Sequence, residues 1–105
     1  MLVKSGTTTD AYATTKLFPE GKSVNMVVSN KHASRVATLK VWGYVTKGDT
    51  DSGVEIRAEA DLAGDTDEEV SVTKLYEEII ISIKTKTTPN HLDYEIHAII
   101  SKVGV

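Results

Sequence analysis

The chain has 105 residues, a length that fits one domain with a hydrophobic core of its own. Its net charge of −3 and isoelectric point near 5.5 argue against a nucleic-acid partner, since a protein that binds phosphate backbones carries a basic surplus on one face. Because the chain has no cysteine, a disulfide framework, a thiolate nucleophile and a cysteine-ligated zinc site are excluded.

Residues 1–22 are rich in threonine and glycine and sustain neither the helical nor the strand period. We expect them to form an extended N-terminal arm that ends in a turn at 19–22, where the sequence reads Pro-Glu-Gly-Lys. The arm either packs on its own domain or leaves it to dock on a neighbouring subunit. Its candidate interface residues are Tyr12, Leu17 and Phe18.

The segment most important for the fold is 76–87, which reads Y-E-E-I-I-I-S-I-K-T-K-T and holds the densest β-branched run of the chain. The strand period places Ile79, Ile81 and Ile83 on one wholly aliphatic face. A helix competes weakly here because β-branched side chains lose χ1 freedom in helices. The segment is therefore predicted to be a central strand.

Other segments alternate apolar and polar residues and are separated by turn-rich loops. The clearest is 54–62, whose valine, isoleucine, alanines and leucine are expected to point inward and its charged residues outward. Gly43 lies inside another such segment and predicts a bulge or a close backbone approach. The full set of predicted strands is 23–30, 35–46, 54–62, 70–74, 75–87 and 94–103.

About six strands at this spacing, plus whatever the arm contributes, are typical of an all-β fold. We predict a single antiparallel β-sandwich of about 6–8 strands, of the jelly-roll or immunoglobulin-like type. The sandwich domain is expected to span residues 23–105, after the arm of residues 1–22.

Two loops carry enough carboxylates to be considered as calcium sites. One holds Asp49 and Asp51 within 47–53, and the other is the acidic stretch 63–69. Neither has the twelve-residue ligand spacing of a recognisable calcium loop. We expect both loops to be solvent-exposed turns, and we predict no metal or cofactor.

Trp42 and Tyr44 project from one face of the predicted strand 35–46, beside Lys40. An exposed aromatic pair can stack on a sugar ring or anchor a protein interface. Alternatively, this face is the inner one or is covered by the arm, and Trp42 is part of the core.

The sequence contains no recognisable catalytic motif. His32, His91 and His97 lack metal-ligand spacing, and there is no nucleophile elbow or glycine-rich phosphate loop. A non-enzymatic protein is therefore expected. No signal peptide and no apolar run long enough for a membrane span is visible, so we expect a product made without Sec-type export and without a membrane partner.

Several segments together resemble the small β-sandwich structural proteins of virions and related surface assemblies. They are S-V-N-M-V-V-S-N-K, V-A-T-L-K-V-W-G-Y-V, V-E-I-R-A-E-A-D-L and L-Y-E-E-I-I-I-S-I-K, within residues 23–103. The resemblance implies a structural subunit in many copies, such as a virion decoration, cement or tail component. Such a subunit forms a homo-oligomer or joins a larger protein assembly, in a virion or another extracellular particle. The alternative is a carbohydrate-binding module that uses Trp42 and Tyr44.

Overall fold

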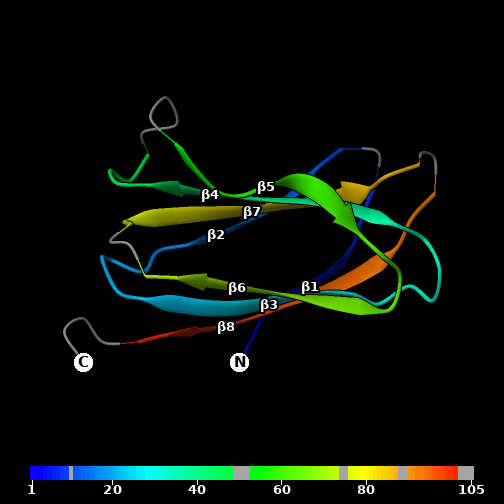
Figure 1. Ribbon diagram of the computed structural model, residues 1–105, viewed down its shortest axis with the longest axis horizontal. Helices are drawn as coiled ribbons and strands as arrows, with labels where there is room; N and C mark the ends of the chain where they lie inside the picture. Colours follow the sequence, from blue (N-terminus) through cyan, green and yellow to red (C-terminus); the bar gives the residue numbers. More distant parts are fainter. Residues whose placement is uncertain (10, 49–52, 74–75, 88–89, 102–105) are drawn as a thin grey trace.

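The computed structural model describes residues 1–9, 11–48, 53–73, 76–87 and 90–101. These residues form eight strands in two four-stranded antiparallel sheets that lie as two layers (Figure 1). The predicted all-β sandwich is confirmed. The strands are β1 (Leu2–Thr7), β2 (Ala13–Leu17), β3 (Val24–Asn30), β4 (Ala37–Tyr44), β5 (Val54–Leu62), β6 (Thr66–Val72), β7 (Glu78–Thr85) and β8 (Asp93–Ile100).

The strand order selects one of the two predicted sandwich types. One sheet runs β1-β8-β3-β6 and the other runs β2-β7-β4-β5, so that the chain changes sheets at every connection except that between β4 and β5. This is the double Greek-key order of a jelly roll, and it differs from the immunoglobulin sheets. The described residues contain no helix long and apolar enough to cross a membrane.

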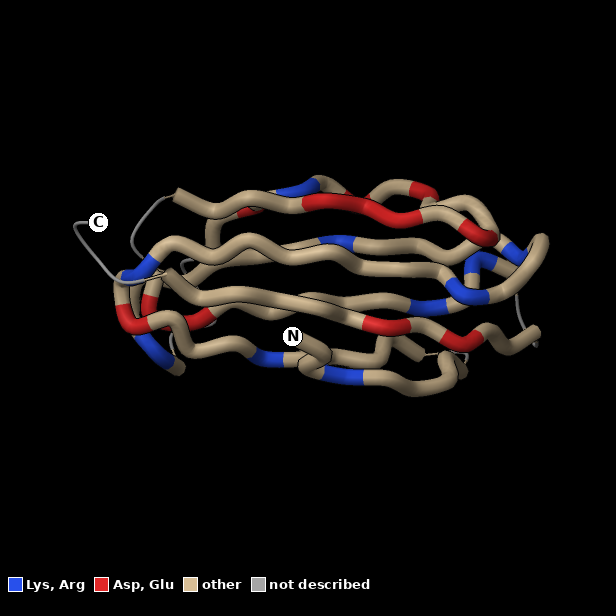
Figure 2. Tube along the Cα trace, turned by 90° about the horizontal axis from the view of Figure 1, so that it is seen from below, with Lys and Arg blue, Asp and Glu red and all other residues tan. Residues whose placement is uncertain are grey.

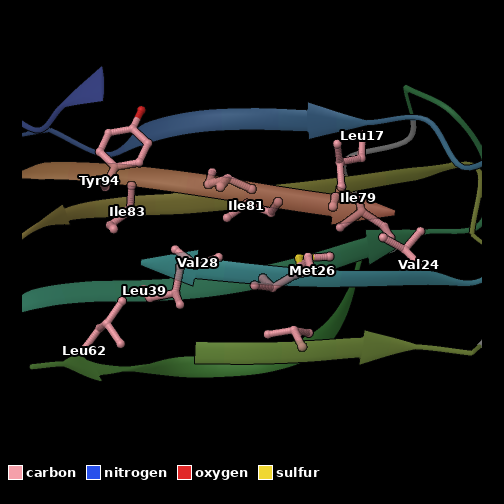
Figure 3. Packing of buried hydrophobic residues seen from close by; sticks show 14 of the residues in the cluster. Leu17, Val24, Met26, Val28, Leu39, Leu62, Ile79, Ile81, Ile83 and Tyr94 are labelled. Carbon is pink, nitrogen blue, oxygen red and sulfur yellow. The ribbon is translucent and has the colours of Figure 1, made fainter. Parts of the chain in front are cut away.

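The core lies between the sheets and is centred on β7, as predicted. Ile79, Ile81 and Ile83 have no exposed surface, and β7 lies between β2 and β4. Val24 and Met26 approach them from β3 in the opposite sheet (Figure 3). Since burying one isoleucine contributes roughly 1.5–3 kcal/mol, this row of side chains is a main source of stability.

The predicted arm of residues 1–22 is corrected by the structure. β1 pairs with β8 and β2 pairs with β7, so each supplies one edge strand of the sandwich. The sandwich therefore begins at residue 2 and not at residue 23. The turn at its predicted position is present, because the Lys22 N–H donates to the Pro19 carbonyl at 3.0 Å, with positive φ at Glu20 and Gly21.

The strand β5 has the predicted bounds but not the predicted inner face. Of its expected inward residues only Leu62 is buried, and Val54 is 40 % exposed. The register with β4 shifts twice, which adds bulges to β5 and turns Arg57 toward the space between the sheets. There its Nε lies 3.4 Å from the Glu68 carboxylate of β6 in the other sheet. Arg57, expected to point into solvent, instead closes the open side of the sandwich.

Two further expectations concern the neighbourhood of β5. The acidic stretch 63–69 is not all loop, because β6 begins at Thr66 and pairs with β3 over its whole length. Gly43 is closely approached, as predicted. A Cβ built there would lie 2.8 Å from the Tyr76 ring, so a larger residue would displace a buried aromatic side chain.

Candidate binding surfaces

An open groove of about 280 Å³ lies on the outer face of the sheet β2-β7-β4-β5. Its walls are Lys40, Trp42 and Tyr44, which alternate along β4 and point away from the core. Its floor is Ile80 and Ser82 of β7, which pair with Trp42 and Lys40 respectively. Trp42 and Tyr44 are each half-buried, so their rings are accessible and belong to this groove instead of the core.

Gly53 packs against both aromatic rings of the groove. A Cβ at this position would lie 2.5 Å from the Tyr44 ring and 2.8 Å from the Trp42 ring. Any other residue would have to displace the rings. The residue before β5 therefore helps to fix the orientation of the aromatic pair.

Tyr12 extends from the segment before β2 over the same outer face. Its ring lies 4.4 Å from the Lys40 Nζ and 4.6 Å from the Lys84 Nζ, and its hydroxyl donates to the Glu59 carboxylate. Burial, followed by the hydrogen bond and the charge of Glu59, raises the pKa of Tyr12 to about 12. The phenol is therefore neutral near pH 7, and the ring holds two ammonium groups by cation–π contacts.

The predicted interface residues of the N-terminal segment have different environments. Leu17 is only 6 % exposed and is part of the core, so the prediction that it anchors a partner is wrong. Phe18 is 44 % exposed and carries the Lys47 Nζ 4.8 Å above its ring. Tyr12 is occupied by contacts within the chain.

The two lateral edges of the sandwich differ in charge (Figure 2). At one edge, β1 and β2 hold Lys4 and Lys16 and no acidic residue. At the other edge, β5 and β6 hold Arg57 and six acidic residues, which are Glu55, Glu59, Asp61, Asp67, Glu68 and Glu69. Sequence reasoning missed this separation, because the alternation pattern does not show which strands are outermost in their sheets.

The edge strand β1 also exposes apolar surface. Leu2 is 51 % exposed and Val3 is 39 % exposed, and a register shift at Val3 interrupts the pairing with β8. Lys4 follows on the same strand. This edge therefore combines apolar side chains with a positive charge.

Metal ligands do not gather in the described part of the chain. Within residues 1–9, 11–48, 53–73, 76–87 and 90–101, no group of three or more histidine, aspartate or glutamate side chains is placed to hold an ion. Asp49 and Asp51 lie outside these described residues. The three histidines bind separate partners, with the His32 Nδ1 accepting from the Ser34 and Arg35 N–H groups.

The fold and these surfaces define a jelly-roll β-sandwich with an accessible aromatic groove and two edges of unlike charge. No protein-family model matches the sequence, and no curated protein sequence matches it. Solved structures of similar fold include PirA, with 11 % identity, a TM-score of 0.61 and coverage of 91 % of this chain and 92 % of PirA.

Two other similar structures come from different contexts. One is chitosan-binding module 1 of a chitosanase/glucanase from Paenibacillus sp. IK-5, with 11 % identity, a TM-score of 0.56 and coverage of 89 % and 75 % of the two chains. The other is from infectious bursal disease virus Gt strain, with 13 % identity and a TM-score of 0.51, and it covers 90 % of this chain but only 27 % of the viral chain. These likenesses establish the fold, and they include a viral protein, in line with the coarse resemblance noted from the sequence.

Proposed function

We propose that this chain is a non-enzymatic assembly subunit that associates with copies of itself edge to edge. The observation that carries the proposal is the opposite charge of the two lateral edges, the lysines of β1 and β2 against the carboxylates of β5 and β6. Unpaired edge strands present backbone donors and acceptors that readily pair with another chain. A place in a virion or another extracellular particle is part of the same proposal.

The strand directions support continuation of both sheets across such a contact. Because every neighbouring pair is antiparallel, β1 runs opposite to β6 in one sheet and β2 runs opposite to β5 in the other. A second copy displaced sideways without being turned would therefore offer β1 antiparallel to β6. The pairing β1–β6 is favoured, because β6 pairs regularly with β3 whereas β5 carries two bulges.

The charges favour this head-to-tail contact over a two-fold symmetric one. Pairing β6 with β6 of another copy would place Asp67 and Glu69 beside carboxylates of the same kind, and like charges opposite one another are destabilising. Pairing β6 with β1 avoids this, because β1 has no acidic residue; it brings Lys4 to the sheet face that Glu68 shares and buries Leu2 and Val3. A head-to-tail contact generates a ring if the rotation closes and a filament if it does not.

The experiment measures the oligomeric state of two charge-reversed variants. We expect the wild-type chain to sediment as a multimer that dissociates as salt rises, because contacts between exposed charges are screened. Lys4→Glu with Lys16→Glu makes both edges acidic, and Asp67→Lys with Glu69→Lys gives β6 a net positive charge. Each variant alone is expected to be monomeric, and an equal mixture of the two is expected to associate again.

A matched control keeps the same change in net charge away from the edge strands. Lys22→Glu with Lys47→Glu alters two lysines that follow β2 and β4, in the connections between strands. This control is expected to assemble like the wild type. A wild-type chain that stays monomeric at every concentration, or a mixture of the reversed variants that does not associate, would overturn the proposal.

We propose saccharide binding as a second candidate function, supported by the groove of Trp42 and Tyr44. Aromatic rings held on a sheet face can stack on sugar rings, and Ser82 adds a hydroxyl at the floor. This function uses the outer face of the sheet β2-β7-β4-β5 and not its lateral edges. Titration of the wild-type chain with saccharides, followed by the fluorescence of its single tryptophan, tests it.

A further inference from the structure

The groove on the outer face has a charged wall as well as an aromatic one. Lys40 lies two residues before Trp42 on β4, and it is the one charged side chain among the described residues that line the groove. No ion pair of Lys40 is found in the described part of the chain. Its ammonium group therefore retains donors for an incoming ligand.

The position of Lys40 is held by Tyr12. The ammonium nitrogen lies 4.4 Å from the centre of the Tyr12 ring, and the phenol is fixed in turn by its hydrogen bond to Glu59. The Tyr12 ring carries no net charge, so the cation–π contact leaves the positive charge of Lys40 uncompensated. A carboxylate at the same distance would offset that charge. The lysine is thus pre-positioned beside the aromatic rings while its charge is kept.

Other charged groups on this face are placed differently. Lys84 shares the Tyr12 ring but does not line the groove, and Glu59 is taken up by the Tyr12 hydroxyl. Glu55 pairs with Trp42 across the strands but is not among the lining residues. Lys16 and Glu78, the cross-strand neighbours of Ile80 and Tyr44, pair with each other and do not line the groove. The charge met by a ligand within the groove is therefore the positive charge of Lys40.

The groove offers three kinds of contact to a ligand, which are aromatic stacking, a hydroxyl group at its floor and one ammonium group. A saccharide can lay the apolar face of a ring on Trp42 or Tyr44 and exchange hydrogen bonds with Ser82. An acidic substituent would form a charge-assisted hydrogen bond with Lys40. From these contacts we infer that the groove binds an anionic saccharide, one that carries a carboxylate or a sulfate group.

This inference rests on the second candidate function, saccharide binding, and is independent of assembly through the edges. A cationic saccharide is disfavoured because its ammonium groups would meet that of Lys40. A neutral saccharide would keep the stacking but lose the charged hydrogen bond, and is expected to bind at least about tenfold more weakly.

The test titrates the full chain with four hexasaccharides and follows the fluorescence of Trp42, which is the single tryptophan. Hexagalacturonate carries carboxylates, a heparin-derived hexasaccharide carries sulfates, cellohexaose is neutral and the glucosamine hexamer is cationic. Comparison of the first two shows whether the groove binds a carboxylate or a sulfate group more tightly. We expect one or both of them to bind more tightly than cellohexaose, and no binding of the glucosamine hexamer.

Two lysine variants assign the effect to the groove. Lys40→Gln removes the charge inside the groove and is expected to weaken binding of the anionic saccharide about tenfold or more. Lys84→Gln removes the same charge from the same face and the same Tyr12 ring, but outside the groove, and should change binding by less than about threefold. Trp42→Ala should weaken binding of the anionic and the neutral saccharides alike, as measured by calorimetry.

The outcomes distinguish saccharide binding itself from the preference for an anionic saccharide. Binding of cellohexaose as tight as that of hexagalacturonate and the heparin fragment, with no effect of Lys40→Gln, would overturn the anionic class while leaving saccharide binding intact. Equal losses in Lys40→Gln and Lys84→Gln would overturn the assignment to the groove. No response to any of the four saccharides would overturn both saccharide binding and this inference.

Discussion

The strands β7 and β5 both place an apolar residue at every second position, but they have different places in the same sheet. In β7 the inward isoleucines 79, 81 and 83 are completely buried, whereas in β5 the corresponding alanines 58 and 60 stay exposed. β7 has a neighbouring strand on each side, and β5 is an edge strand that curls away through two bulges. Alternation thus reports which residues share a face, but not how deeply that face is covered.

The largest effect on stability is expected when two edge strands are removed at once. Deletion of residues 1–22 takes away β1 and β2, uncovers the backbone of β8 and β7, and removes Leu17 from the core. We expect loss of cooperative thermal unfolding, measured by circular dichroism, because the opened sheets no longer enclose the core.

The charge variant Lys4→Glu with Lys16→Glu serves as the control for this deletion. It keeps both strands and should still melt cooperatively, at a somewhat lower temperature because Lys16→Glu replaces an ion pair with Glu78 by a like-charge contact. If the deleted chain melts like the full one, residues 1–22 are dispensable for the fold and the original expectation of a separate arm is restored.

A smaller effect is expected from one isoleucine in each strand. Ile81→Ala should lower the free energy of unfolding by about 2–5 kcal/mol, because a cavity forms in a site with no exposed surface. Ile56→Ala in β5 should cost about 1 kcal/mol, since its side chain is only half-buried and the edge can relax. Urea unfolding of both variants measures the difference, and equal losses would contradict the contrast between the strands.

The sequence predicted the central strands of the fold more fully than its edges. Alternation correctly predicted which residues of β3, β4 and β7 point inward. Each of these strands has a neighbouring strand on both sides, so its inward residues lie well inside the core. The segments that became β1, β2 and the start of β6 were read as arm and loop. Edge strands are stabilised largely by backbone hydrogen bonds to one neighbour, which leave little trace in side-chain type.

The candidate surfaces were predictable only in part. Trp42, Tyr44 and Lys40 could be placed on one strand face from their spacing, and the structure leaves the two rings accessible. The floor from β7 and the Tyr12 contacts depend on which strands pair, and strand order cannot be read from the alternation pattern of a single sequence. The separation of charge between the edges has the same origin.

The ion pair between Arg57 and Glu68 tests how the open side between β5 and β6 is held. Arg57→Met should lower the free energy of unfolding by about 1 kcal/mol, because the pair and a hydrogen bond from Arg57 Nη1 to the Leu39 carbonyl are lost. Urea unfolding of Lys86→Met gives the control, since its pair with Asp61 is exposed and should contribute close to nothing. A loss in Lys86→Met as large as that in Arg57→Met would contradict a special role for this contact.

The smallest expected effect concerns the titration of two tyrosines, Tyr12 on the outer face and Tyr94 in the core. Burial raises the pKa of Tyr94 in the core, while burial and then the Glu59 carboxylate raise the pKa of Tyr12 to about 12. A raised tyrosine pKa means that the folded state favours the neutral phenol. Its contribution to stability is complete below the ordinary pKa of about 10 and is lost as the pH rises from there through about 12.

Phenolate absorbance after a rapid jump in pH measures these titrations before the chain unfolds. Tyr12→Phe should remove one step near pH 12, and Glu59→Gln should move that step partway toward pH 10, since burial remains while the carboxylate is lost. Neither variant changes the surroundings of Tyr94, whose titration should stay where it is. A wild-type chain in which Tyr12 titrates near pH 10 would show that the phenol is not held by Glu59, and Lys40 would then lose the neutral ring that positions it.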